Sequence, residues 1–336
     1  MKVDASTTKV TVIGEALIDL VPGDSRLTFT AHPGGSPYNV AIGLARLGVD
    51  TSLMARLSDN AFGRMLRECA AAEGVDLSAA PLAVEPATLA VVSFDAEARA
   101  SYEFYLEGTA DWQWSESESE QLPAETAILH FGSIASWTPP GGDRIADLAR
   151  RTHDRGDVLV SYDPNIRPSL LKDSAHARTT VERCVRLAHI AKASTEDVAW
   201  LYPDDSVEEV GHRWLDFGSK MVIITGGPAG ALAFSESGVR LDHAGIEVTV
   251  SDTVGAGDSF TSGLLASFTK RGIRSPHLLS SCKEEDLFGA IDDAIWASAI
   301  TCERPGADPP KSADIDSERQ RSTSLSLLRQ QTPRTA

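Results

Sequence analysis

Residues 252–260 read Asp-Thr-Val-Gly-Ala-Gly-Asp-Ser-Phe and place one carboxylate directly after a run of small residues. The small side chains of Gly255, Ala256 and Gly257 let a phosphate or a developing oxyanion approach the backbone N–H groups at a helix start. Asp258 would repel a bound phosphate, so we expect it to accept a proton instead. A phosphate-binding turn beside a general base is suited to transferring a phosphoryl group to a hydroxyl. The alternative is a glycine-containing loop whose Asp only caps a helix.

A second string, residues 33–41, reads Pro-Gly-Gly-Ser-Pro-Tyr-Asn-Val-Ala. Gly34 and Gly35 permit a ligand to approach the backbone closely. Asn39 falls in the first turn of the following helix and offers both hydrogen-bond donors and acceptors. A tight turn before a helix is the alternative interpretation. Asp19, which ends the segment Gly-Glu-Ala-Leu-Ile-Asp, is typical of a surface turn when it is taken alone.

Three further strings follow predicted strands, at the strand ends where α/β sheets place ligands. Residues 163–168 contain Arg167, whose planar guanidinium suits a phosphate or sugar hydroxyls. Residues 192–197 end in Ser-Thr-Glu-Asp, and residues 224–231 contain a glycine-rich turn. Taken alone, these strings also fit a rigid turn with a structural Asp–Arg pair, a helix capped by Ser194 and a strand–turn–strand connection.

In this order, the strings resemble the signatures of the ribokinase-like (PfkB-type) carbohydrate kinases over roughly residues 8–310. Residues 252–260 are similar to the C-terminal signature of that family, in which the residue that matches Asp258 is the catalytic base. Residues 33–41 are similar to its N-terminal signature, and residues 163–168 look like those of its fructokinase-type members. The resemblance implies ATP-dependent phosphorylation of the primary hydroxyl of a small sugar, with fructose as the first candidate.

The resemblance also assigns a role to each matched residue. Asp258 is the base, and the backbone of Gly255, Ala256 and Gly257 holds the charge of the transferred group. The residues assigned to the sugar are Asp19, Gly34, Gly35, Asn39 and Arg167. The residues assigned to the nucleotide are Thr225, Gly227, Gly230 and Ala299.

Two kinds of metal ion follow from the same resemblance. The family commonly carries Asn-x-x-Glu to organise water around Mg²⁺ and the phosphates, whereas this chain has Ser194-x-x-Asp197. Asp197 is therefore assigned to Mg²⁺ through water only, and helix capping by Ser194 accounts for the pair equally well. Carbonyl groups around Asp252 and Val254 often hold a monovalent cation in the family. The expected cofactors are ATP and Mg²⁺, with K⁺ as a candidate activator.

Other functions remain open from the residues alone. A kinase of this kind could act on ribose or 2-keto-3-deoxygluconate, because the shape of the pocket decides the sugar. The same fold could also serve as a non-catalytic sugar- or nucleotide-binding regulator. Two other phosphate-binding motifs are excluded, since the chain contains no GxxxxGK[ST] and Gly255-x-Gly257 lacks the third glycine of a dinucleotide fingerprint.

The elements that must position these residues alternate between buried strands and helices. Strands are expected at 10–13, 127–131, 158–162, 190–193 and 221–225, and helices at 36–48, 143–154 and 179–188. A further β-rich run at 246–250 precedes the anion-binding turn. This alternation predicts an α/β fold with a mostly parallel central sheet covered on both faces, and the resemblance specifies a ribokinase-like three-layer sandwich.

One region departs from this alternation. Residues 89–94, 101–106 and 27–31 are typical of strands, and residues 101–106 alternate apolar and polar side chains, which is the pattern of a half-buried hairpin. A simple edge hairpin is one interpretation. The other is a small β-strand lid over the site, built from about residues 20–33 and 87–110.

Composition limits the partners and the location of the chain. The 336 residues are 42% hydrophobic and carry a formal net charge of −17, which argues against nucleic acid because phosphate backbones require basic patches. No apolar run reaches the length of about 18 residues that a transmembrane helix needs, so no membrane partner is expected. The four cysteines are scattered, and the first residues lack the apolar core of a signal peptide, which favours a cytoplasmic protein.

The domain boundary is expected near residue 310. Residues 1–310 would form the kinase domain, and residues 311–336 are rich in Ser, Arg, Gln and Thr, so we expect a largely disordered tail. The expected partners are the sugar and ATP, and a homodimer through the lid is a candidate assembly.

Overall fold

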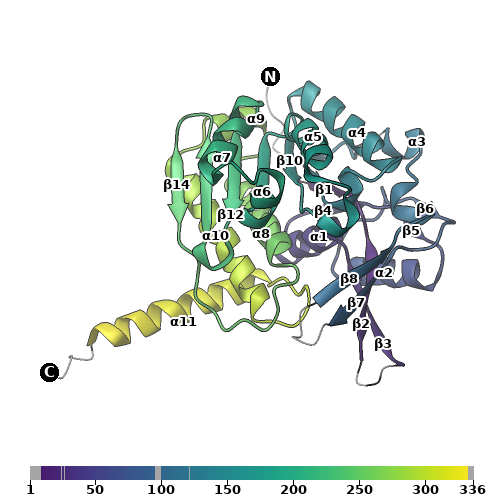
Figure 1. Ribbon diagram of the computed structural model, residues 1–336. Helices are drawn as coiled ribbons and strands as arrows, with labels where there is room; N and C mark the ends of the chain where they lie inside the picture. Colours follow the sequence, from purple (N-terminus) through teal and green to yellow (C-terminus); the bar gives the residue numbers. More distant parts are fainter. Residues whose placement is uncertain (1–8, 24, 26, 95–99, 121, 332–336) are drawn as a thin grey trace.

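The computed structural model describes residues 9–23, 25, 27–94, 100–120 and 122–331. Among these residues an eight-stranded sheet has the order β14-β13-β12-β11-β10-β9-β1-β4, and helices cover both of its faces (Figure 1). Its strands are β1 (Lys9–Ile13), β4 (Thr51–Met54), β9 (Thr126–Gly132), β10 (Leu159–Asp163), β11 (Ile190–Ser194), β12 (Met221–Thr225), β13 (Ala231–Ser235) and β14 (Arg240–His243). The strands from β12 to β4 pair in parallel, which confirms the predicted α/β class with a mostly parallel sheet.

Helices pack on both faces of this sheet, and the C-terminal one projects from the body (Figure 1). They are α1 (Ser36–Arg46), α2 (Ala61–Ala72), α3 (Glu116–Ser119), α4 (Gly141–Arg155), α5 (Ser174–Val185), α6 (Thr195–Leu201), α7 (Val207–Asp216), α8 (Ala256–Lys270), α9 (Pro276–Ser280), α10 (Glu284–Cys302) and α11 (Ser312–Gln331). Leu265 and Phe268 of α8 and Ile291 of α10 are fully buried in one core, and Trp214 of α7 is fully buried in the other. Short 3₁₀ turns are η1 (Ala110–Trp112), η2 (Ile134–Ser136), η3 (Pro168–Leu170) and η4 (Gly227–Ala229).

A smaller sheet, which we call the small sheet, has the order β3-β2-β7-β8 and stands at one side of the body (Figure 1). Its strands are β2 (Leu17–Pro22), β3 (Phe29–Gly34), β7 (Leu89–Phe94) and β8 (Ala100–Tyr105), and the pair β5 (Leu57–Ser58) and β6 (Leu82–Ala83) lies apart from it. The predicted hairpin of β7 and β8 is confirmed, with Val92 opposite Tyr102 and Ala90 opposite Phe104. The predicted turn at 95–100 lies almost entirely outside the described residues.

The prediction of a β-strand at 246–250 is wrong. β14 ends at His243, and residues 244–250 continue without regular secondary structure. Ile246, Glu247, Val248 and Val250 line a cavity there, so these residues form a loop along the cavity and not a strand paired with a neighbour.

The prediction of a disordered tail is also wrong for Ser312–Gln331, which form α11. Asp314 fixes the start of the helix by accepting hydrogen bonds from the Lys311 backbone N–H (2.9 Å) and from the Arg304 guanidinium (3.0 Å). Ile315 is buried in the core. Composition alone underestimates the order of such a segment, because one buried apolar side chain and a few ion pairs are enough to hold its first turns against the body.

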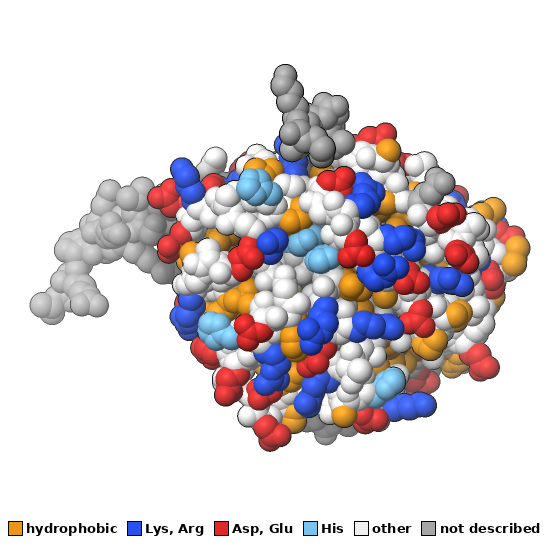
Figure 2. Space-filling view, turned by 90° about the horizontal axis from the view of Figure 1, so that it is seen from above, with side chains coloured by type: hydrophobic (Ala, Val, Ile, Leu, Met, Phe, Trp, Pro, Cys, Tyr) orange, Lys and Arg blue, Asp and Glu red, His pale blue; other side chains and the backbone are white. Residues whose placement is uncertain are grey.

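The surface of the body agrees with the charge of the chain. Figure 2 shows acidic and basic side chains interspersed over one face, an arrangement that differs from the basic stripe that a nucleic-acid backbone requires. Within the described part of the chain, no helix is both long and apolar enough to cross a membrane.

Candidate active site

Two adjoining cavities lie at the carboxyl edge of the central sheet. The smaller cavity has a volume of about 410 Å³ and extends beneath the small sheet, and the larger cavity has a volume of about 750 Å³. Asn165, Arg167, Thr253 and Gly257 line both cavities. A ligand in one cavity can therefore meet a ligand in the other at this shared wall.

The anion-binding turn predicted at the start of α8 forms this junction. Gly255 is the N-cap residue with φ 77°, and a Cβ on it would lie 2.7 Å from the Cβ of Ala307, so glycine is required there. Gly257 and Asp258 follow in the first turn, where backbone N–H groups have no partner within the helix. The N–H of Ala256 donates to the carbonyl oxygen of Thr253 at 3.2 Å, a long hydrogen bond that an incoming anion would have to replace.

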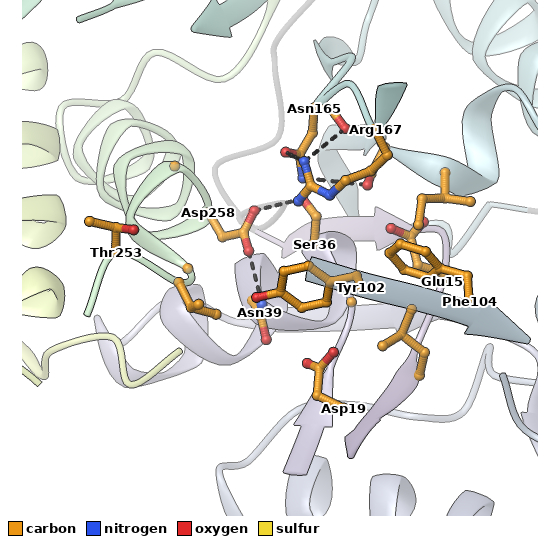
Figure 3. Close-up of a pocket in the computed structure, with 17 residues that line it drawn as sticks. Glu15, Asp19, Ser36, Asn39, Tyr102, Phe104, Asn165, Arg167, Thr253 and Asp258 are labelled. Atoms are coloured by element: carbon orange, nitrogen blue, oxygen red, sulfur yellow. Dashed lines mark hydrogen bonds between the residues drawn. The ribbon is translucent and has the colours of Figure 1, made fainter. Parts of the chain in front are cut away.

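Asp258 is buried and is held by two side chains of α1 (Figure 3). Ser36 donates from its hydroxyl to Oδ1 at 2.6 Å, and Asn39 donates from its amide to Oδ2 at 2.9 Å. Burial raises the pKa of Asp258, and the hydrogen bonds from Ser36 and Asn39 offset only part of this rise. A buried carboxylate with a raised pKa at the edge of a cavity is suited to accept a proton.

Gly34 and Gly35 shape the opposite side of the smaller cavity. A Cβ on Gly34 would lie 2.1 Å from Oδ2 of Asp19, so glycine leaves room for that carboxylate. Gly35 has φ 100°, and a Cβ there would lie 2.9 Å from the carbonyl oxygen of Glu15. The structure thus brings Gly35, Asn39 and Asp19 to one cavity, and Gly34 lies against the carboxylate of Asp19 without lining the cavity itself.

Asp19 lies in strand β2 and not in a surface turn, which the sequence taken alone favoured. Its carboxylate lines the smaller cavity below Asn39 (Figure 3). Burial raises the pKa of Asp19 to about 6, and the neighbouring charges of Arg167 and Asp258 act in opposite directions on it. The carboxylate can accept hydrogen bonds from a polyhydroxylated ligand.

Arg167 is fixed at the wall shared by the two cavities. Its Nη1 donates to Oδ1 of Asn165 at 2.7 Å and to the carbonyl oxygen of Ile166 at 3.1 Å. The structural Asp–Arg pair that the sequence left open is not the arrangement found, since the buried partner of Asp163 is Lys192, with Nζ 2.7 Å from Oδ2.

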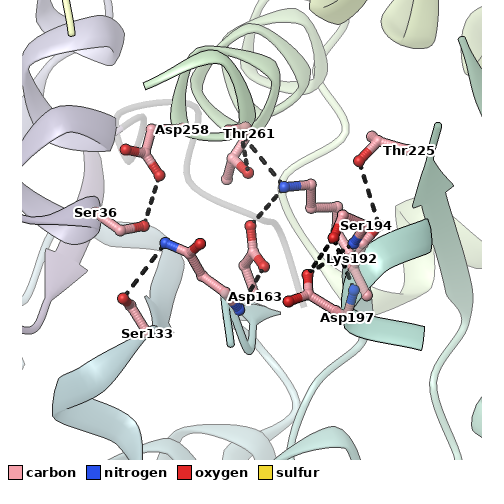
Figure 4. Close-up of polar contacts among 12 residues, drawn as sticks. Ser36, Ser133, Asp163, Lys192, Ser194, Asp197, Thr225, Asp258 and Thr261 are labelled. Atoms are coloured by element: carbon pink, nitrogen blue, oxygen red, sulfur yellow. Dashed lines mark hydrogen bonds and ion pairs between the residues drawn. The ribbon is translucent and has the colours of Figure 1, made fainter. Parts of the chain in front are cut away.

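Lys192 was not predicted as a site residue, although it stands in the string at 192–197. Its ammonium pairs with Asp163 and lies 3.4 Å from the carbonyl oxygen of Gly257, at the first turn of α8 (Figure 4). Burial lowers the pKa of Lys192, but Asp163 more than offsets this effect, so the pKa is raised and the ammonium stays charged. A fixed positive charge therefore lies directly behind the anion-binding turn.

Asp197 forms a capping box with Ser194, as the alternative interpretation of that pair required. Its Oδ2 accepts from the Ser194 backbone N–H at 2.9 Å and from the hydroxyl at 2.7 Å, and its Oδ1 accepts from the Ile166 backbone N–H at 2.8 Å. Burial raises the pKa of Asp197. The side chain lines the larger cavity, but both of its oxygens are engaged within the protein.

The residues assigned to a nucleotide all line the larger cavity. They are Thr225, Gly227, Gly230 and Ala299. Gly227 (φ 54°) and Gly230 (φ 96°) adopt left-handed conformations, and a Cβ on Gly230 would lie 2.0 Å from the carbonyl oxygen of His243. This close packing explains why the turn needs glycine.

Asp252 joins the loop at 252–254, which was assigned to a monovalent cation, to the loop that contains Gly306. Its Oδ1 accepts from the backbone N–H of Val254 at 3.0 Å, and its Oδ2 accepts from the backbone N–H of Gly306 at 2.9 Å. The carboxylate thus places the two loops side by side.

Several lining residues were missed by sequence reasoning. Ser36 lies inside the quoted string at 33–41, and Tyr102 and Phe104 lie in the alternating pattern of β8, which could have indicated their common face. Glu15 lines the smaller cavity while its Oε2 accepts from the Ala135 backbone N–H at 3.0 Å. Burial raises the pKa of Glu15 to about 7. No spacing in the sequence links Glu15 to the loop after β9.

A buried carboxylate beside a glycine-containing helix start, between a small polar cavity and a larger one, is an arrangement suited to a phosphotransferase that acts on a hydroxyl of a small molecule. A family model described as pfkB family carbohydrate kinase matches residues 7–314. The chain therefore belongs to the pfkB family of carbohydrate kinases, which confirms the predicted family and the predicted enzyme class.

Curated relatives extend over most of the chain. It is 34% identical over 282 residues to a fructokinase of Rhizobium leguminosarum bv. trifolii, a match that covers 83% of this chain and 85% of the relative. It is 36% identical over 270 residues to a fructokinase of Klebsiella pneumoniae, covering 79% of this chain and 86% of that one.

Solved structures share the architecture. A double mutant of the Vibrio cholerae O395 fructokinase, bound to fructose, ADP and a potassium ion, superposes with a TM-score of 0.81 at 27% identity, covering 93% of this chain and 98% of that chain. The Xylella fastidiosa fructokinase with bound ATP has a TM-score of 0.86 at 23% identity, covering 94% of this chain and 99% of that chain, and shows the shared fold. These structures confirm the ribokinase-like architecture.

Proposed function

We propose that this chain is an ATP-dependent fructokinase that phosphorylates the primary hydroxyl of fructose. The observation that carries the proposal is the position of Asp258, which Ser36 and Asn39 hold at the point where the two cavities meet. The fructokinases among the similar proteins support fructose as the substrate, and the fructose and ADP bound in one of the solved structures support the pairing of sugar and nucleotide.

In this mechanism the sugar occupies the smaller cavity. Asp19 and Asn39 hydrogen-bond its hydroxyls, Gly35 lets it approach the backbone, and Gly34 leaves room for the Asp19 carboxylate. Asp258 accepts the proton of the primary hydroxyl as that oxygen bonds to the terminal phosphorus of ATP. The bond from this phosphorus to the bridging oxygen breaks, and ADP leaves with the electron pair. Proton transfer to a positioned base of this kind contributes typically about 10²–10⁴-fold to the rate.

The nucleotide occupies the larger cavity, with its phosphates directed to the start of α8. The N–H groups of Gly255, Ala256 and Gly257 hold the charge of the transferred group. Arg167 adds positive charge beside that turn, and the ammonium of Lys192 lies behind it in its ion pair with Asp163. Thr225, Gly227 and Gly230 border the phosphates, and Ala299 borders the base.

The residues fit a divalent ion that is held mainly by the phosphates and by water. Within the described residues, no three His, Cys, Asp or Glu side chains gather as ligands for a metal ion, and both oxygens of Asp197 are engaged in the capping box and with Ile166. When bound, Mg²⁺ would withdraw negative charge from the phosphate oxygens. K⁺ would bind to carbonyl oxygens of the loops that Asp252 joins, near Val254.

The small sheet acts as the lid in this proposal. Tyr102 and Phe104 of β8 lie across the smaller cavity from Asn39 (Figure 3). Their rings exclude water, which would otherwise accept the phosphoryl group in place of the sugar. The same sheet exposes Leu27, Phe29 and Tyr105 to solvent near its strands, which supports a homodimer through the lid, and sedimentation equilibrium measures that assembly.

A coupled ADP-release assay across fructose, ribose, 2-keto-3-deoxygluconate and adenosine tests the proposed substrate. We expect kcat/KM for fructose to exceed that for each of the others by at least about tenfold, a ratio that about 1.4 kcal/mol of differential transition-state binding provides. A tenfold preference for ribose or for the keto-acid assigns the chain to another sugar. ADP release that no sugar stimulates, together with intact ATP binding, indicates a nucleotide-binding regulator.

A further inference from the structure

Helix α11 projects from the body of the molecule (Figure 1). Its first turn is docked by Asp314 and Ile315, as described above. Ser312 adds a hydrogen bond from its hydroxyl to the carbonyl oxygen of Leu47 at 3.2 Å. The second turn then lies against α10, and the side chain that makes the contact is Arg319.

The guanidinium of Arg319 forms ion pairs with two consecutive carboxylates of α10. Its Nη2 lies 2.5 Å from Oδ2 of Asp292 and 2.7 Å from Oδ1 of Asp293, and its guanidinium carbon lies 5.9 Å from the centre of the Trp296 ring. These side chains are only about one-third exposed, with 35% for Arg319 and 31% for Asp292. Such a shared, partly buried pairing is worth more than an isolated surface ion pair.

Asp292 continues the contact to the end of β14. Its Oδ1 lies 3.2 Å from Nε2 of His243, whose side chain is 13% exposed, a close charge contact whose geometry is not that of a hydrogen bond. The other ring nitrogen of His243, Nδ1, lies 2.9 Å from the carbonyl oxygen of Ala244, and its ring packs 4.7 Å from that of Phe288. Arg319, Asp292 and His243 thus join α11, α10 and the strand end, and we call these three residues the clamp.

The strand end that the clamp holds is a wall of the larger cavity. The carbonyl oxygen of His243 lies so close to Gly230 that a Cβ there would be 2.0 Å away, and a Cβ on Gly245 would be 2.4 Å from the carbonyl oxygen of Pro228. Gly245 and the loop after it line the larger cavity, as do Ile295 and other residues of α10, the helix that carries Asp292. The clamp therefore ties together two walls of one cavity.

We propose that Arg319, Asp292 and His243 are positioning residues for the nucleotide, which fix α10 and the loop at 244–250 against the Gly227–Gly230 turn. The clamp residues do not line the cavity themselves and act through His243 and its neighbours. The inference rests on the proposed binding of ATP in the larger cavity. It makes the affinity for ATP, and not the affinity for the sugar, depend on the C-terminal helix.

The test compares Arg319→Ala with Arg321→Ala, which lies on the same helix. Arg321 is 72% exposed and pairs with Glu318 within α11, so its removal leaves the clamp intact. We expect Arg319→Ala to raise the Kd for ATP, measured by calorimetry without sugar, by about three- to tenfold, because a partly buried pair is lost. Arg321→Ala should stay within about twofold, and KM for fructose should stay within about twofold in both variants.

Two further measurements separate positioning from a general loss of structure. Arg319→Lys keeps the charge but not the planar fork, so we expect an intermediate Kd for ATP at an unchanged Tm. His243→Asn alone and combined with Arg319→Ala should give clearly less than additive effects on the Kd for ATP, since both variants break the same connection.

Three outcomes would overturn the clamp: an unchanged Kd for ATP in Arg319→Ala, equal effects of the two arginine variants, or fully additive effects in the cycle. A parallel rise of the sugar KM together with a fall in Tm would also overturn it, because that combination indicates a structural role only. If wild type binds ATP but phosphorylates no sugar, the proposed function fails, whereas the calorimetric comparison still decides the clamp.

Discussion

Replacing Asp258 with asparagine separates its chemistry from its place in the structure. In the wild-type protein both carboxylate oxygens accept, one from Ser36 at 2.6 Å and one from Asn39 at 2.9 Å. An asparagine can direct its carbonyl oxygen to Asn39 and its amide to Ser36, whose hydroxyl can turn to accept it. The fold should therefore survive, and because burial raises the pKa of Asp258, removing the charge relieves part of a desolvation penalty.

The catalytic loss should be large in comparison. The amide of an asparagine cannot take the proton of the sugar hydroxyl, and a general base contributes about 10²–10⁴-fold. This range corresponds to about 3–5 kcal/mol of transition-state stabilisation. We therefore expect kcat of Asp258→Asn to fall by at least about two decades, while Kd for ATP stays the same or decreases, because a negative charge beside the phosphates is removed.

The assay measures kcat by coupled ADP release, Kd for ATP by calorimetry, and Tm for each variant. Asp154→Asn, on the exposed end of α4, is a matched control that should change none of these quantities. If kcat of Asp258→Asn stays within about threefold of wild type, Asp258 is not the base and the proposed mechanism is refuted. A fall in Tm that accompanies the loss of kcat would attribute the effect to folding instead.

Other perturbations test separate parts of the site. Ser36→Ala removes a hydrogen bond that lowers the pKa of Asp258, and since the base works ionised, the acid limb of the kcat/KM profile should move to higher pH. Gly34→Ala should raise KM for fructose without changing Kd for ATP, because its Cβ would collide with Oδ2 of Asp19. K⁺ should raise kcat relative to a bulky organic cation at equal ionic strength, and equal rates would exclude the cation site. A chain that ends at Pro310 should have a Tm at least about 4 °C lower, as buried contacts of α11 are lost.

Much of the fold could be predicted because parallel strands are buried on both faces. The segment Met221–Thr225, for example, reads Met-Val-Ile-Ile-Thr and forms β12 as expected. Strand β2 was missed because Asp19 interrupts its apolar residues, and that carboxylate faces a cavity and not a core. The opposite error occurred at 246–250, where alternating apolar residues line a cavity without a partner strand. In both cases the side chains face a cavity where a core or a partner strand would usually lie, and a local sequence pattern does not indicate where a cavity is.

The candidate site shows the same division. The two glycine-containing strings could be assigned from local chemistry. A turn with left-handed φ or with close approach to the backbone requires glycine, and glycine is visible in the sequence. The hydrogen bond between Asn39 and Asp258 could not, since it joins side chains 219 residues apart. The pairing of Asp163 with Lys192 was also hidden, since the only partner that the sequence offered for that carboxylate was Arg167, as one of two interpretations.

The choice of partner for Asp163 decides how the site can hold a nucleotide. Lys192 and Asp163 largely cancel each other's charge, so their pair stabilises the buried start of α8 without attracting a phosphate strongly. Because Asp163 pairs with Lys192, the guanidinium of Arg167 stays at the wall shared by both cavities, where the phosphoryl group would be transferred in the proposed reaction. Asp19 and Asp258 add negative charge at that place, and the chain as a whole carries −17. The positive potential for ATP must therefore come from Arg167, from the backbone of the anion-binding turn and from bound cations, which is why this chain should depend on its metal ions for turnover.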